Sequence, residues 1–217
     1  MDDRFPYPRL TNPGALARLG EWSEEVYRDF EAVRDGRLSE ADFRAKYQRR
    51  TAILCLDMTG FTNAAMRYGE VESLLRIRDA QTVCVPVLAE AGARLVRAFA
   101  DDLVALFDEA PAALDAALEL HRRVRTYNAS GLAGAHPVEC CIGIGYGDVL
   151  ALGPNLAMGD EMNRASKLGE DTARANETLI TQNVYDAVRH RPEFVFTPQN
   201  TDDLAFPYYL VTARPAN

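Results

Sequence analysis

The sequence lacks several features that would place it in a special class of protein. No apolar run is long enough to cross a membrane, and the opening residues, Met-Asp-Asp-Arg, do not form a signal peptide. Internal repeats and low-complexity segments are also missing. These absences exclude membrane, exported and repeat proteins, and they predict a folded protein of the cytoplasm.

Cysteine is scarce, and its spacing does not match a metal site. The four cysteines are Cys55, Cys84, Cys140 and Cys141, with no Cys-x-x-Cys pair among them. Cys55 and the adjacent pair lie in apolar, strand-like runs. We interpret the cysteines as reduced core residues, which excludes a zinc site or a disulfide framework.

Positive charge is also in short supply. The chain has 24 Lys and Arg residues against 32 Asp and Glu residues, for a net charge of −8. This balance argues against a nucleic-acid-binding surface. An anionic substrate would therefore need metal ions or a local basic patch to be held.

The remaining composition is that of a globular protein with a core and an added arm. The chain has 217 residues, of which 47% are hydrophobic and 26% charged. Residues 1–50 are predicted to form an N-terminal helical arm, with one helix over 14–34 and another from a cap at Ser39 to Arg50. We interpret this arm as a packing element that covers the domain or a dimer partner. A regulatory transmitter helix is the alternative.

Residues 51–217 are predicted to form the main domain. The expected elements are a strand at 51–57, helical sequence at 63–90, two strands within 94–107, a helix at 110–124, a strand at 138–144, a turn at 145–147, a helix from 159, a strand at 178–181, a helix at 182–189 and a closing antiparallel pair at 194–197 and 207–211. This order predicts the α+β class, with helices packed on an antiparallel sheet.

Two carboxylates stand where predicted strands end. Asp57 ends the first strand, and Asp101 lies at the turn of the next hairpin. Neighbouring strands would bring them together, and two carboxylates a few ångströms apart repel unless a cation lies between them. The pair therefore predicts a site for Mg²⁺ or Mn²⁺. The adjacent Asp102 is interpreted as an ordinary turn residue.

Two further segments could hold an anion beside these carboxylates. Residues 59–62 form a glycine-containing turn into a helix, where backbone N–H groups and the helix dipole favour a phosphate. Asn163 and Lys167 are four residues apart on a predicted helix, so both could meet one phosphate. A metal with a phosphate cradle indicates a nucleoside triphosphate.

Together these segments resemble the catalytic domain of the class III nucleotidyl cyclases. Residues 57–62 (Asp-Met-Thr-Gly-Phe-Thr) match the family's Asp-Ile-x-Gly-Phe-Thr, and residues 97–101 stand where the family has Lys-x-x-Gly-Asp. Residues 159–167 match Gly-Asp-x-Val-Asn-x-Ala-x-Arg, and residues 143–147 resemble a Gly-Ile-x-x-Gly turn. The resemblance covers residues 51–212 in order and spacing, and is more specific than any single motif.

The resemblance implies a ferredoxin-like domain that works as a head-to-tail homodimer with composite active sites. It would convert a nucleoside triphosphate to a 3′,5′-cyclic nucleotide and pyrophosphate by positioning and electrostatics. The roles implied are two Mg²⁺ or Mn²⁺ ions on Asp57, Asp101 and the Met58 carbonyl, phosphate binding by Thr59, Gly60, Phe61 and Thr62, ribose orientation by Asn163, and charge stabilisation at the α-phosphate by Lys167. Asn163 and Lys167 would come from the other protomer.

Two departures from the family concern the base. Arg97 replaces the base-reading Lys, and Leu156 stands where adenylate cyclases carry Asp or Thr. Leu accepts no hydrogen bond, so the adenine amino group would lose roughly 1–3 kcal/mol. Arg97 offers only donors, which suits the two carbonyls of uracil. The chain thus resembles the bacterial pyrimidine nucleotide cyclases of antiphage signalling. UTP is the expected substrate and CTP a possible one, giving cUMP or cCMP as a messenger of antiviral defence; an adenylate cyclase is the alternative.

Two other departures leave a second alternative open. Lys167 replaces the usual Arg and keeps the charge without the bidentate fork. No Lys or Arg lies between Arg191 and Arg214, so the triphosphate tail would need another cation, such as Arg50. These features favour a catalytically silent nucleotide-binding dimerisation module. A nucleic-acid polymerase palm shares the two carboxylates but is disfavoured by the acidic net charge.

Overall fold

The structure is a computed structural model that describes residues 7–20, 22–59, 66, 69–134, 137–152, 157–199 and 204–214. The chain divides into two compact units. The first combines Met1–Arg49 with Leu150–Met158, and the second combines Arg50–Val149 with Gly159–Asn217. Among the described helices, none has both the length and the apolar character needed to span a bilayer.

The first unit contains two helices where the hydrophobic periodicity predicted one. They are α1 (Pro13–Leu19) and α2 (Glu24–Arg34). The backbone is extended at Gly20, and the Ser23 hydroxyl accepts a hydrogen bond from the Val26 N–H at 3.3 Å. A serine cap of this kind starts a new helix. The expectation of a single helix was wrong because the apolar spacing continues across this boundary.

The predicted cap at Ser39 is confirmed. Helix α3 (Glu40–Tyr47) begins directly after it, and the Ser39 hydroxyl accepts a hydrogen bond from the Asp42 N–H at 3.0 Å. The helix ends before Arg50, because strand β1 begins at Gln48. The buried centre of this unit consists of Val26, Phe43 and Leu152, with Trp22, Phe30, Val33, Leu38, Tyr47 and Leu150 packed against it.

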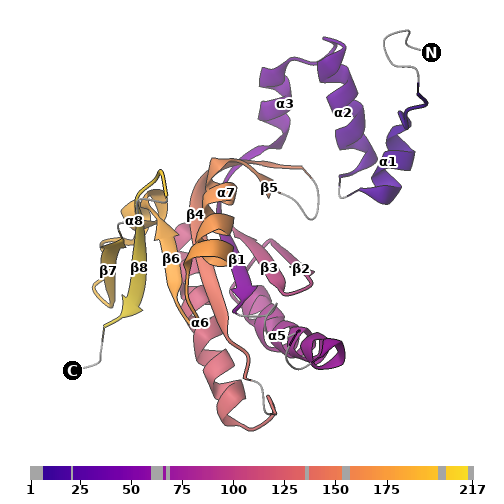
Figure 1. Cartoon of the computed structure of the whole chain (residues 1–217). Coiled ribbons are helices and arrows are strands. Elements are labelled where there is room, and N and C mark those ends of the chain that lie inside the picture. Colours follow the sequence, from indigo (N-terminus) through magenta and orange to yellow (C-terminus); the bar gives the residue numbers. More distant parts are fainter. Residues whose placement is uncertain are drawn as a thin grey trace. The chain divides into compact units, whose positions relative to one another are not determined.

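The second unit is built on a sheet of the predicted α+β class (Figure 1). Its strands are β1 (Gln48–Met58), β2 (Leu95–Phe99), β3 (Asp102–Phe107), β4 (Cys140–Ala151), β6 (Thr178–Thr181), β7 (Phe194–Gln199) and β8 (Tyr208–Ala213). Over the described residues the strand order is β2-β3-β1-β4-β6-β8-β7, and the short β5 (Ala157–Met158) pairs with the end of β4.

The sheet is mixed rather than wholly antiparallel as expected. The β1–β3, β2–β3, β6–β8 and β7–β8 ladders are antiparallel, whereas β4 and β6 pair in parallel. The parallel pair arises because the connection between these strands contains helix α7 (Asp160–Ser166) and the π-helix η1 (Lys167–Thr172). A parallel pair needs a crossover of this kind.

Helices cover the two faces of the sheet differently (Figure 1). The long helices α5 (Glu70–Glu90) and α6 (Ala110–Ala129), with α8 (Gln182–Val188), enclose the main hydrophobic core against one face. Ile142 and Ile144 of β4 point into that core. Because strand side chains alternate between faces, residues between them point the other way, toward α7 and η1.

Strand β4 continues through the turn predicted at residues 145–147. A Cβ atom at Gly143 would lie 2.1 Å from the Ala165 carbonyl oxygen, and one at Gly145 would lie 2.3 Å from the Glu161 carbonyl oxygen. These glycines therefore allow α7 to pack directly on the strand. The turn prediction was wrong because glycine serves close approach here, not a change of direction.

His121 places a titratable ring in the core. It lies on α6, is 5% exposed, and its Nε2 is 3.0 Å from the Thr178 hydroxyl. Burial lowers the pKa of His121 to about 4, and the positive charge of Arg125 acts in the same direction. The folded protein therefore holds this ring neutral at pH values where an unfolded chain would protonate it.

We predict that this ring makes the fold sensitive to acid. Between pH 6.5 and pH 4 the unfolded chain binds a proton that native His121 does not, so stability falls as the pH falls, by at most about 3 kcal/mol. Urea unfolding at pH 7 and pH 5 should show a smaller loss for His121→Gln than for the wild-type protein. All other groups titrate in both proteins, so equal losses would contradict the prediction.

Candidate functional site

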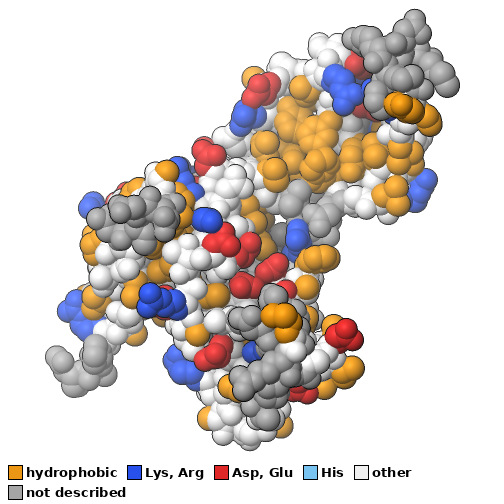
Figure 2. Space-filling model, in the orientation of Figure 1, with side chains coloured by type: hydrophobic (Ala, Val, Ile, Leu, Met, Phe, Trp, Pro, Cys, Tyr) orange, Lys and Arg blue, Asp and Glu red, His pale blue; other side chains and the backbone are white. Residues whose placement is uncertain are grey.

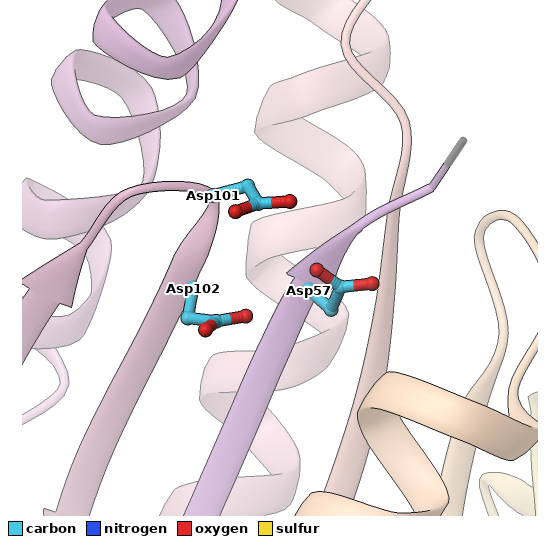
Figure 3. Close-up of side chains that lie close together, drawn as sticks. All are labelled: Asp57, Asp101 and Asp102. Atoms are coloured by element: carbon cyan, nitrogen blue, oxygen red, sulfur yellow. The ribbon is translucent and has the colours of Figure 1, made fainter. Parts of the chain in front are cut away.

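Three aspartates meet where β1 and the β2–β3 hairpin end (Figure 3). Asp57 is the penultimate residue of β1, Asp101 lies in the hairpin turn, and Asp102 begins β3. One carboxylate oxygen from each lies within 4.8 Å of the others. The structure thus places Asp57 beside Asp101, as neighbouring strands were expected to do. Figure 2 shows acidic side chains gathered on the visible face of this unit.

The strand register explains why Asp102 joins this cluster. Leu56 is opposite Leu103 in the β1–β3 ladder, so the next positions along, Asp57 and Asp102, also face each other. Directly opposed residues share one face of the sheet. The interpretation of Asp102 as a simple turn residue was therefore incomplete. No local sequence signal would have found it, because the neighbour of Asp102 depends on the register between β1 and β3.

The three carboxylates are half-buried and repel one another. Burial, together with the negative charge of Asp101 and Asp102, raises the pKa of Asp57 to about 7. Burial also raises the pKa of Asp102, with Glu170 and Asp101 adding to the effect and the positive charge of Arg97 opposing it. A divalent cation would relieve this repulsion, and carboxylate oxygens are the ligands that Mg²⁺ and Mn²⁺ prefer.

The hairpin turn that carries Asp101 is strained. Ala100 has a φ of 49°, in the left-handed region, where a side chain costs about 1–2 kcal/mol. Ala100 stands where the family that the sequence resembles has Gly. The Gln81 side chain donates a hydrogen bond to the Ala100 carbonyl at 3.3 Å and holds the turn from α5. Backbone strain of this kind is often found at functional sites.

The residues that follow Asp57 are only partly described. Met58 is 1% exposed, so only its backbone could serve a ligand. The Thr59 N–H donates to the Glu139 carbonyl at 3.0 Å, and its hydroxyl donates to the Cys141 sulfur at 3.6 Å. Thr59 is therefore attached to the segment at the start of β4. The expected binding residues Gly60, Phe61, Thr62 and Leu156 lie outside the described residues.

Arg97 lies on the same face as the aspartates. It is opposite Val104 on edge strand β2, two positions from Phe99, which is opposite Asp102. The Arg97 guanidinium lies 5.6 Å from the centroid of the Phe99 ring, which is 64% exposed. A cation and an exposed aromatic ring thus adjoin the acidic cluster.

Asn163 and Lys167 project from a different element. Asn163 is on α7, and Lys167 follows at the start of η1; both are exposed. The Lys167 ammonium donates to the Asp171 carboxylate at 2.8 Å, in an exposed pair that contributes little stability. Within the described chain, neither side chain hydrogen-bonds to the three aspartates.

Arg50 is badly placed for a triphosphate tail held at the aspartates of its own protomer. It lies at the opposite end of β1 from Asp57, roughly 20 Å away at about 3.3 Å per residue. Its guanidinium instead lies 4.8 Å from the centroid of the Tyr146 ring. Because β1 separates Arg50 from Asp57 within one protomer, the expected contact of Arg50 with a triphosphate tail stays a prediction that a second protomer would have to satisfy.

We predict that Ala100→Gly stabilises the protein by up to about 1 kcal/mol, because glycine adopts the left-handed conformation without strain. The matched control is Ala98→Gly in the adjoining strand, which should destabilise by about 0.5–1 kcal/mol. Urea unfolding in the presence of a chelator measures both. A loss of stability in Ala100→Gly similar to that of the control would contradict the strain.

Comparison with known proteins identifies the fold. No protein-family model matches the sequence, and no curated protein matches it. Many solved structures are similar, and three of those that cover 78% of this chain illustrate the match. They are the catalytic core of a rhodopsin-guanylyl cyclase with converted specificity in complex with ATPαS (TM-score 0.66, 21% identity, 98% of that chain covered), the guanylate cyclase domain of RhGC from Catenaria anguillulae in complex with GTP (0.64, 21%, 98%) and the adenylyl cyclase CyaB from P. aeruginosa (0.64, 16%, 97%).

These matches span nearly the whole of each cyclase domain, and their low identities make them a comparison of folds. The shared architecture includes the sheet whose strand ends carry the three aspartates. The fold that the sequence motifs implied is therefore confirmed. The chain has the fold of the class III adenylyl and guanylyl cyclase catalytic domains.

Proposed function

We propose that the chain is a nucleotidyl cyclase that converts a nucleoside triphosphate to a 3′,5′-cyclic nucleotide and pyrophosphate. The observation that carries this proposal is the meeting of Asp57, Asp101 and Asp102 within 4.8 Å. A module that served only for dimerisation would gain nothing from three mutually repelling, half-buried carboxylates. The similar structures with bound GTP and ATPαS support a nucleoside triphosphate as the substrate.

The aspartates suit Mg²⁺ or Mn²⁺, with the Met58 carbonyl as a further oxygen ligand. When bound, two such ions would lower the pKa of the attacking 3′-hydroxyl and offset the charge of the triphosphate. Asp57 and Asp101 are the expected ligands, and Asp102 adds a third carboxylate at the same place. The raised pKa of Asp57 supports this role, because it reflects unbalanced negative charge that a cation would offset.

The other reacting groups would come from a second protomer. Asn163 would orient the ribose, and Lys167 would stabilise the charge that develops on the α-phosphate, while the backbone of residues 60–62 would hold the phosphates, because the Thr59 N–H already donates to the Glu139 carbonyl. Both side chains are exposed and do not hydrogen-bond to the aspartates of their own protomer, which supports a head-to-tail homodimer with two composite sites. Among the similar structures, one is a non-canonical dimeric guanylyl cyclase domain and another is a monomeric one.

We infer a pyrimidine substrate, with UTP favoured over CTP. Arg97 offers only donors, and its place beside Phe99 and the acidic cluster supports a base-reading role. Leu156 removes the acceptor that adenine would use. A pyrimidine product would serve as a cytoplasmic messenger of antiviral defence, as the resemblance to the pyrimidine cyclases implies. An adenylate cyclase is the competing assignment.

The repulsion among the aspartates predicts that the stability of the metal-free protein depends on pH through Asp57. The raised folded-state pKa of about 7 means that metal-free protein loses stability as the pH rises from 4 through 7. In a chelator, Asp57→Asn should therefore melt about 2–4 °C above the wild-type protein at pH 8, and the difference should shrink as the pH falls and vanish near pH 4. Millimolar Mn²⁺ should raise the melting temperature of the wild-type protein much more than that of the variant.

The matched control for this test is Asp186→Asn, which removes an exposed carboxylate on α8. It should leave both the pH dependence and the Mn²⁺ response unchanged. An equal Mn²⁺ response in Asp57→Asn would remove Asp57 from the metal site.

The catalytic proposal predicts cyclic product from purified protein, Mn²⁺ and one of ATP, GTP, CTP or UTP, with cUMP the main product by chromatography. Asp57→Ala and Asn163→Ala should each be inactive. Mixing the two variants should restore about a quarter of the wild-type rate, because half of the dimers are mixed and each contains one intact composite site.

The possible outcomes separate the alternatives. A clear preference for ATP would assign an adenylate cyclase. Absence of product from all four nucleotides would end the cyclase proposal, and calorimetric nucleotide binding without turnover would then support the silent module.

A further inference from the structure

Glu161 is a buried carboxylate in the segment that carries Asn163 and Lys167. It lies in the first turn of α7, and its side chain is 6% exposed. Charged side chains are almost never buried to this extent without specific partners. The role of Glu161 therefore follows from the groups that it contacts.

The carboxylate receives hydrogen bonds from three directions. Its Oε2 accepts from the backbone N–H of Tyr146 in β4 at 2.9 Å and from the Thr181 hydroxyl at the end of β6 at 2.7 Å. Its Oε1 accepts from the Arg164 guanidinium at 2.8 Å. One side chain of α7 is thus tied to two neighbouring strands.

These bonds lie where the two strands stop pairing. The parallel β4–β6 ladder extends to Ile144 opposite Ile180. Tyr146 and Thr181 come just beyond this last pair, and the Glu161 carboxylate bridges them. The side chain therefore accepts from the Tyr146 N–H, which lies beyond the last pair of the β4–β6 ladder, and ties this backbone group to the Thr181 hydroxyl.

The packing around Glu161 leaves little room for α7 to shift. A Cβ atom at Gly145 would lie 2.3 Å from the Glu161 carbonyl oxygen, and one at Gly147 would lie 2.8 Å from its Cγ. The first turn of the helix therefore rests directly on the backbone of β4. A change at Glu161 acts two residues away from Asn163, on the same short helix.

We propose that Glu161 is a positioning residue, whose carboxylate locks the first turn of α7 to β4 and β6 and thereby sets the orientation of Asn163 and Lys167 toward substrate. This inference rests on the proposed cyclase function. It assigns Glu161 no contact with substrate. The physical reason for an effect on rate is that a shift of about 1 Å in a catalytic group can cost about 100-fold.

The test compares Glu161→Ala, Glu161→Gln and Thr181→Val with Asp186→Asn as the matched control for loss of an acidic side chain. Glu161→Ala should lower kcat by about 10–100-fold with a much smaller change in KM. Glu161→Gln keeps an acceptor for the Tyr146 N–H and should recover part of the loss. Thr181→Val removes one donor and should fall between Glu161→Gln and the wild-type protein.

Hydrogen exchange supplies a readout that does not depend on turnover. In Glu161→Ala, amides of residues 160–172 should lose protection, while those of α6 keep it. Unchanged exchange over residues 160–172, or a kcat within about twofold of the wild-type value, would overturn the inference. Equal loss of protection in α6 would also overturn it, because the effect would then be global.

Mixing experiments locate the defect. Glu161→Ala should complement Asp57→Ala, because the mixed dimer then has one site with intact aspartates and an intact α7. Complementation of Asn163→Ala instead would overturn the inference. If the wild-type protein makes no cyclic product, the proposed function fails, and the exchange measurement alone decides whether Glu161 anchors α7.

Discussion

Electrostatic repulsion at the ends of β1 and β3 is the constraint on which the site depends. Asp57, Asp101 and Asp102 are held within 4.8 Å of one another in a half-buried setting, where three ionised carboxylates are unfavourable without a cation. The hydrophobic core beneath them and the strand register hold them in this arrangement. The left-handed Ala100 adds strain at the same place. The acidic cluster thus lowers the stability of the metal-free protein at the place where the proposed chemistry requires concentrated negative charge.

The same sheet also positions Asn163 and Lys167, the second half of the proposed site, through close packing of α7 on β4. Alternate glycines along β4 leave its outer face bare, so α7 packs on backbone, and the buried Glu161 carboxylate attaches it to the strands. The exposed Asn163 and Lys167 then project outward, away from any hydrogen bond with the aspartates of the same chain. One protomer thus carries both halves of a site without joining them, which is the physical basis for proposing that two protomers complete it.

The elements predicted from sequence agree with the structure where local patterns decide the conformation, and they differ where tertiary contacts decide it. Alternation and helical spacing predicted most of the strands and the long helices, because burial of an apolar face dominates those segments. The errors came where another interaction decided the conformation. A serine cap broke the expected helix over residues 14–34, and close packing of α7 kept residues 145–147 in a strand. The pairing of β1 with β3 gave Asp102 a neighbour that its sequence position did not indicate.

By itself, the sequence determined the α+β class, the cyclase-like motif order and the meeting of Asp57 with Asp101. The reason is that hydrophobic periodicity and carboxylates at strand ends are local features, which can be recognised in the sequence without knowing the fold. The tertiary structure alone decided that Asp102 completes the cluster and that Glu161 is buried. Each of these depends on register or on packing between segments far apart in the chain, and no local pattern encodes the distance between such segments.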